Sequence, residues 1–129
     1  PPYIVFTGGE PTLQLDEKLI EACKQEGFIM GIETNGTKKV VPGIDWICVS
    51  PKPNAPLKQT SGHELKLIFP QKEREMMPHH FTDLDFEHFY LQPMDNTQSQ
   101  ENTQAVVDYC LKHPAWKVSF QLHKTLGLR

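Results

Sequence analysis

The chain has 129 residues and a formal net charge of -3, from 13 lysines and arginines against 16 aspartates and glutamates. No basic run is interleaved with aromatic side chains, which excludes a nucleic-acid footprint and a polybasic membrane surface. The apolar stretches are far shorter than the roughly 20 residues of a membrane-spanning helix, and no secretory leader pattern is seen. We therefore predict a soluble, cytoplasmic protein without nucleic-acid or membrane partners, in which residues 1–129 form a single domain.

In the first half of the chain, short apolar runs alternate with a helical pattern. Residues 3–6 are predicted to form a buried strand, and the apolar spacing of residues 15–23 predicts a helix that ends near Gly27. Residues 28–32 and 45–49 are predicted as the next two strands, and the prolines that follow exclude a long helix up to residue 62.

The second half continues the alternation. Residues 64–69 alternate with period two, residues 86–91 form another apolar run, and residues 71–85 are weakly patterned. An amphipathic helix is predicted from about residue 98 to residue 112, followed by a last strand at residues 116–120. Strands that alternate with helices are typical of α/β proteins with a mainly parallel sheet.

The three cysteines do not form a metal-binding motif. Cys23, Cys48 and Cys110 lie far apart in the sequence, and their number is odd, so they match neither clustered metal ligands nor a disulfide framework. Each lies within an apolar pattern, which favours packed, reduced thiols. We predict no metal ligands in this chain.

Polar and turn residues follow several of the predicted strands. Four such clusters occupy residues 7–11, 33–36, 50–52 and 92–95, and residues 121–124 are a fifth candidate. Ligands of parallel α/β sheets bind beyond the carboxyl ends of the strands, so these clusters are expected to surround one ligand. Each cluster taken alone is also compatible with ordinary turn chemistry.

The first cluster suits the head group of an amino acid. Gly8 and Gly9 allow a ligand to approach the backbone closely and expose amides to a carboxylate, while Glu10 can accept an ammonium group. Gly-Gly next to Pro is also common turn material. The position directly after an apolar strand favours the binding interpretation.

The other clusters offer complementary groups. Lys52 supplies a positive charge beside the Ser50 hydroxyl, although for this lone triplet a solvated lysine is the more ordinary interpretation. Gln92 carries a donor and an acceptor suited to the edge of a heterocycle, and Asp95 can accept hydrogen bonds from a ribose or simply belong to a turn. Among the six histidines only His123 lies at a predicted strand end.

Six segments, taken in order, resemble the 7-carboxy-7-deazaguanine synthases of queuosine and deazapurine biosynthesis. These segments are Thr7-Gly8-Gly9-Glu10-Pro11, Glu33-Thr34-Asn35-Gly36-Thr37, Ser50-Pro51-Lys52, Glu64-Leu65-Lys66, Gln92-Pro93-Met94-Asp95 and Gln121-Leu122-His123-Lys124. Gly-Gly-Glu-Pro alone indicates only the radical S-adenosylmethionine superfamily, whereas the last two segments are specific to this family.

The resemblance implies an incomplete (β/α) barrel of the radical S-adenosylmethionine type. It implies a lyase that contracts the ring of 6-carboxy-5,6,7,8-tetrahydropterin to give 7-carboxy-7-deazaguanine. The implied cofactors are S-adenosylmethionine, a 4Fe-4S cluster and Mg²⁺. A reductant such as flavodoxin and a homodimeric assembly are implied as partners.

The resemblance also assigns residues to ligands. The residues implied to bind S-adenosylmethionine are Gly8, Gly9, Glu10, Ser50, Pro51, Lys52, Gln92, Pro93, Met94 and Asp95. The residues implied to contact the pterin substrate are Thr7, Arg129 through its terminal carboxylate, Glu33, Asn35 and His123. None of these residues is expected to be catalytic.

One departure from the family pattern is a missing motif. The family's Cys-x-x-x-Cys-x-x-Cys loop, and the magnesium-binding threonine after it, would precede Pro1 together with the first strand of the barrel. Because thiolates hold such clusters, we expect this chain alone to be inactive. Two other interpretations are a different radical S-adenosylmethionine activating enzyme and a cluster-free nucleotide-binding domain.

Overall fold

The computed structural model describes residues 1–120. Internal contacts divide the chain into two compact units. Residues 1–65 and 84–87 form the first unit, and residues 66–83 and 88 onwards form the second. The single domain expected from chain length stays a prediction.

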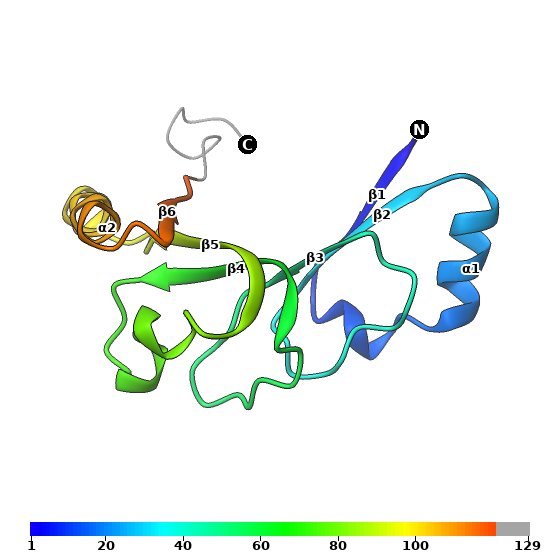
Figure 1. Ribbon diagram of the computed structural model, residues 1–129, viewed down its shortest axis with the longest axis horizontal. Coiled ribbons are helices and arrows are strands. Elements are labelled where there is room, and N and C mark those ends of the chain that lie inside the picture. Colours follow the sequence, from blue (N-terminus) through cyan, green and yellow to red (C-terminus); the bar gives the residue numbers. More distant parts are fainter. Residues whose placement is uncertain (121–129) are drawn as a thin grey trace. The chain divides into compact units, whose positions relative to one another are not determined.

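The described residues contain one six-stranded sheet (Figure 1). Its strands are β1 (Tyr3–Phe6), β2 (Ile29–Thr34), β3 (Trp46–Val49), β4 (Ser61–Phe69), β5 (Asp85–Pro93) and β6 (Trp116–Val118), and they neighbour one another in that order. The pairs β1–β2, β2–β3, β3–β4 and β5–β6 are parallel. The sheet is open, because its order ends at β1 and at β6. The predicted α/β class with a mainly parallel sheet is confirmed.

In residues 1–120, two α-helices and three short 3-10 helices accompany the strands. They are η1 (Pro11–Leu13), α1 (Glu17–Gln25), η2 (Arg74–Met76), η3 (Pro78–His80) and α2 (Ser99–Lys112). The weakly patterned stretch 71–85 therefore holds η2 and η3. No helix within residues 1–120 is long and apolar enough to cross a membrane.

In the first unit, α1 lies beside β1 and β2 (Figure 1). The helix begins where the Asp16 carboxylate accepts a hydrogen bond from the Leu19 amide at 2.9 Å, which satisfies one of the free amides of the first turn. It ends before Gly27, whose φ of 82° suits a residue without a side chain. Leu15, Ile20, Met30 and Ile32 form the buried core between helix and sheet.

The structure corrects two details of the prediction for this unit. Residues 3–6 form a strand, but Tyr3 and Val5 are 52% and 47% exposed. Alternate side chains of a strand point to opposite faces, so Tyr3 and Val5 share the exposed face of β1, whereas Phe6 on the other face packs against the core. Leu19 is one of the apolar residues whose spacing predicted the helix, but it is 45% exposed, whereas Ile20 is buried. The two side chains point about 100° apart around the helix, so only one of them faces the core.

In the second unit, α2 lies beside β6 (Figure 1). Val106 on α2 is fully buried, as are Leu67 on β4 and Leu91 on β5. The rings of Phe89 and Trp116 lie 5.2 Å apart across the β5–β6 pair. The predicted helix 98–112 is confirmed nearly to the residue, while the last strand is shorter than predicted.

Candidate functional site

The carboxyl ends of β1, β2 and β3 meet at one edge of the first unit, because the three strands are parallel neighbours. Glu10 follows β1, Thr34 is the last residue of β2, and Ser50 follows β3. The Ser50 amide donates to the Thr34 carbonyl at 2.8 Å. The fold thus brings together the polar clusters 7–11, 33–36 and 50–52.

Within the described part of the chain, four hydrogen bonds hold Glu10 at this edge. Its Oε2 atom accepts from the Thr12 amide at 3.1 Å, from the Thr34 hydroxyl at 2.6 Å and, at very short range, from the Thr12 hydroxyl. Its Oε1 atom accepts from the Asn35 amide at 2.8 Å. The carboxylate therefore caps η1 and joins the loop after β1 to the end of β2.

These hydrogen bonds keep Glu10 ionised. Burial by itself would raise the pKa of this carboxyl, but hydrogen bonds from the Thr12 and Thr34 hydroxyls and from the Asn35 and Thr12 amides outweigh burial and hold the pKa below its usual value. Hydrogen bonding to the charged form of an acid favours that form. A fixed negative charge is thus present at the strand ends at neutral pH.

We expect this charge to make stability depend on pH. Because the pKa of Glu10 is lower in the folded chain, its contribution is complete above the unfolded pKa of about 4.3 and is lost as the pH falls through the folded value. Glu10→Gln should therefore lose less free energy of unfolding than the parent between pH 5 and pH 3, measured by urea denaturation. Glu21→Gln, at an exposed position on α1, is the control. Equal acid sensitivity of parent and Glu10→Gln would contradict the assignment.

Gly8 and Gly9 leave open space beside the backbone. Both are exposed, and a Cβ atom added at either would meet no heavy atom within 4 Å. Gly8 has a φ of 85°, a conformation that favours glycine. A ligand can reach the backbone here, and Thr7 beside it is also exposed.

The cluster after β3 presents one charged head group. Pro51 is buried and Ser50 is half-buried, whereas Lys52 is exposed. The Lys52 ammonium donates to the Ser50 hydroxyl at 3.4 Å. Such a long contact on an exposed side chain leaves the ammonium accessible to another acceptor.

The two predicted residues at the end of β2 differ in their surroundings. Glu33 is exposed. The Asn35 side-chain oxygen accepts from the Thr37 amide at 3.0 Å and from the Thr37 hydroxyl at 2.7 Å, which closes a local turn. Asn35 therefore meets Glu10 through its backbone amide, and its contact with a substrate stays a prediction.

The cluster 92–95 lies at the end of β5, since Gln92 and Pro93 are the last two residues of that strand, and it belongs to the second unit. Gln92 is buried with 6% of its surface exposed, Pro93 and Met94 are half-buried, and Asp95 is exposed. The Asn102 amide group donates to the Met94 carbonyl at 2.9 Å and so fixes this loop to α2. The remaining predicted residues, His123 and Arg129, lie outside the described residues.

Three polar residues that matter here were missed from the sequence. Thr12 and Thr34 hold Glu10, and Asn102 holds the loop after β5. All three are buried, with 4%, 3% and 5% of their surface exposed. The signal for Asn102 was its place four residues before Val106, on the inward face of the helix. Thr12 gave no signal beyond lying next to the first motif, and Thr34 gave none beyond its place within the second.

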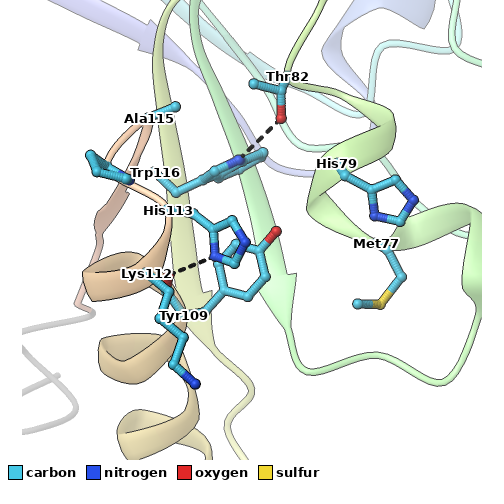
Figure 2. Close-up of a pocket in the computed structure, with 9 residues that line it drawn as sticks. Met77, His79, Thr82, Tyr109, Lys112, His113, Ala115 and Trp116 are labelled. Atoms are coloured by element: carbon cyan, nitrogen blue, oxygen red, sulfur yellow. Dashed lines mark hydrogen bonds between the residues drawn. The ribbon is translucent and has the colours of Figure 1, made fainter.

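A concavity of about 450 Å³ in the second unit contains none of the predicted residues (Figure 2). Trp116 donates to the Thr82 hydroxyl at 3.3 Å on one wall, and the stacked rings of Tyr109 and His113, 3.9 Å apart, form another. His79 lies across from them. Among residues 1–120, the lining holds no carboxylate and so lacks the group that would accept an ammonium.

The described residues offer no metal centre. Within residues 1–120, no group of three or more histidines, cysteines, aspartates or glutamates could hold a metal ion. Within the same residues, Cys23, Cys48 and Cys110 form no disulfide bond. Burial raises the pKa of the Cys110 thiol, which opposes formation of the thiolate that binds metals.

Comparison with known proteins gives close relatives along nearly the whole chain. A curated protein of Bordetella pertussis, named 7-carboxy-7-deazaguanine synthase, is 56% identical over 126 residues, which are 98% of this chain and 59% of the relative. A protein of the same name from Caulobacter vibrioides is 58% identical over 97% of this chain and 59% of its own length. The chain is a homologue of the 7-carboxy-7-deazaguanine synthases. No family model matches it.

A solved structure supports the same family. The crystal structure of QueE from Escherichia coli is similar with a TM-score of 0.70 and 26% identity, over 92% of this chain and 56% of that chain. Together with the open sheet, this likeness confirms the predicted fold, an incomplete (β/α) barrel, and the predicted resemblance to a synthase. The chain spans about three fifths of the length of the curated relatives.

Proposed function

We propose that this chain forms the S-adenosylmethionine-binding part of a 7-carboxy-7-deazaguanine synthase. The observation that carries the proposal is the ionised Glu10 carboxylate, fixed where β1, β2 and β3 end and directly after the open backbone of Gly8 and Gly9. A carboxylate beside free amides complements the ammonium and carboxylate of an amino acid. The proposed reaction is taken from the relatives, which are named 7-carboxy-7-deazaguanine synthase.

In this proposal each cluster binds one part of the cofactor. Glu10 accepts the ammonium of the methionyl group, and the amides of Gly8 and Gly9 receive its carboxylate. The segment Ser50-Pro51-Lys52 contacts the nucleoside, and the segment Gln92-Pro93-Met94-Asp95 lines the same ligand. When bound, S-adenosylmethionine supplies the radical that starts contraction of the pterin ring. For the substrate, the proposed contacts are Thr7, Glu33, Asn35, His123 and Arg129.

The three thiols do not fit a 4Fe-4S cluster. Such clusters need closely placed thiolates, whereas Cys48 is buried within β3 and Cys110 has a raised pKa. We therefore assign the cluster and Mg²⁺ to residues outside this chain and expect the chain alone to be inactive. We also propose that the full-length protein is a cytoplasmic homodimer and that a reductant such as flavodoxin supplies its electrons.

The test is the affinity of the full-length protein for S-adenosylmethionine, measured by calorimetry after anaerobic cluster reconstitution. Glu10→Gln, Lys52→Ala and Gln92→Ala should each keep the cluster and weaken binding, by about tenfold or more for Glu10→Gln, since a hydrogen bond to a charged group contributes about 1.5–3 kcal/mol. Lys18→Ala, at an exposed position on α1, should bind like the parent.

Two results would count against the proposal. No binding by the reconstituted parent protein would favour the cluster-free interpretation. Unchanged affinity in both Lys52→Ala and Gln92→Ala would remove these two residues from the site. Because Gln92 is buried, a thermal melt must accompany its binding curve.

A further inference from the structure

The two oxygens of the Glu10 carboxylate have different surroundings. Among the donors within residues 1–120, three converge on Oε2 and only the Asn35 amide reaches Oε1. A carboxylate oxygen offers two lone-pair directions. Oε2 is thus saturated by the protein, whereas Oε1 keeps one acceptor direction for a ligand.

The buried Thr34 hydroxyl has a defined orientation. Its oxygen accepts a hydrogen bond from the Gly36 amide at 3.1 Å, so its single proton is directed to Glu10 Oε2 at 2.6 Å. Thr12 acts on the same oxygen through both its amide and its hydroxyl. With 3% and 4% of their surface exposed, Thr34 and Thr12 are shielded from competing water.

We propose that Thr34 and Thr12 are positioning residues, which hold Glu10 by Oε2 so that Oε1 receives the ammonium group of the bound ligand. The inference rests on the proposed function. A carboxylate fixed before binding loses little conformational freedom when the ligand arrives, and this preorganisation raises affinity. It also sets specificity, because only a ligand that carries an ammonium uses the free direction on Oε1.

The test compares two ligands of the full-length protein with matched cluster content. S-adenosylmethionine carries an amino-acid group, whereas 5′-methylthioadenosine carries the adenosine without it. Thr34→Val should weaken the binding of S-adenosylmethionine by about tenfold, the factor that corresponds to 1.4 kcal/mol. The affinity for 5′-methylthioadenosine should stay within about twofold of the parent value. Thr34→Ser, which restores the hydroxyl, should recover most of the affinity.

Thr103→Val is the matched control, because the Thr103 hydroxyl donates to the Ser99 carbonyl at 2.8 Å within α2 and does not contact Glu10. It should leave both affinities unchanged. If Thr34→Val does not fold, Thr12→Val decides by the same criterion.

If Thr34→Val weakened the binding of both ligands equally, or weakened the binding of neither, the positioning role would be overturned. Glu10→Gln separates this inference from the proposed function. If Glu10→Gln binds S-adenosylmethionine like the parent, the proposed function has failed at this residue. If Glu10→Gln loses affinity and the threonine variants do not, only the inference fails.

Discussion

Gly36→Ala is expected to lower the free energy of unfolding by about 2–5 kcal/mol. Gly36 has a φ of 76°, which costs a residue with a side chain about 1–2 kcal/mol. An added Cβ would also lie 2.5 Å from Leu57 Cδ1 and 2.8 Å from Val49 Cγ1, and such overpacking costs about 1–3 kcal/mol. Chemical denaturation of the chain measures the sum.

Gly27→Ala separates the two costs. Gly27 has a φ of 82°, but a Cβ there would meet nothing within 4 Å, so only the conformational cost of about 1–2 kcal/mol should appear. If both variants lost the same free energy of unfolding, Leu57 and Val49 would have moved aside without strain, and overpacking would not contribute to the cost of Gly36→Ala.

Gly36 also connects stability to the site. Its amide orients the Thr34 hydroxyl, and its carbonyl accepts from the Lys58 amide at 2.7 Å and the Gln59 amide at 3.0 Å. A displaced residue 36 would therefore disturb the hydrogen bond from Thr34 to Glu10. We expect the full-length Gly36→Ala protein to bind S-adenosylmethionine more weakly as well.

Ile32→Ala is expected to cost about 2–5 kcal/mol, the range for truncation of a buried isoleucine or leucine. Ile32 is 1% exposed and packs with Leu15, Ile20 and Met30 between α1 and β2. The loss combines the transfer free energy of the removed methyl groups with the cavity they leave. Urea denaturation provides the measurement.

Ile29→Ala on the same strand is the control for Ile32→Ala. Ile29 is 36% exposed, so its truncation removes less buried surface and leaves a site open to water. Its cost should be at most about half that of Ile32→Ala. A similar loss of free energy of unfolding in both variants would show that strand propensity, and not burial in the core, determines the cost of truncation.

The positions of the strands and of α2 could be predicted because they depend on local pattern. Apolar runs bounded by glycine and proline marked the strands, and residues 98–112 carried a clear helical period. The boundaries of β2 and β4 were less accurate, since both strands continue into polar residues. Residues such as Thr34 extend a strand because a neighbouring strand offers hydrogen bonds, which periodicity does not record.

For the candidate site, the sequence by itself determined the chemical groups: two glycines and a glutamate after one strand, and polar residues after the next strands. Only the tertiary structure decided the partners of Glu10, because Thr34 and Asn35 lie 24 and 25 residues away and are brought close by the parallel register of β1 and β2. It also decided that Tyr3 and Val5 are exposed, since burial of a strand's side chains depends on what covers each face of the sheet. Composition fixes which atoms can form hydrogen bonds, whereas sheet register fixes which of them meet.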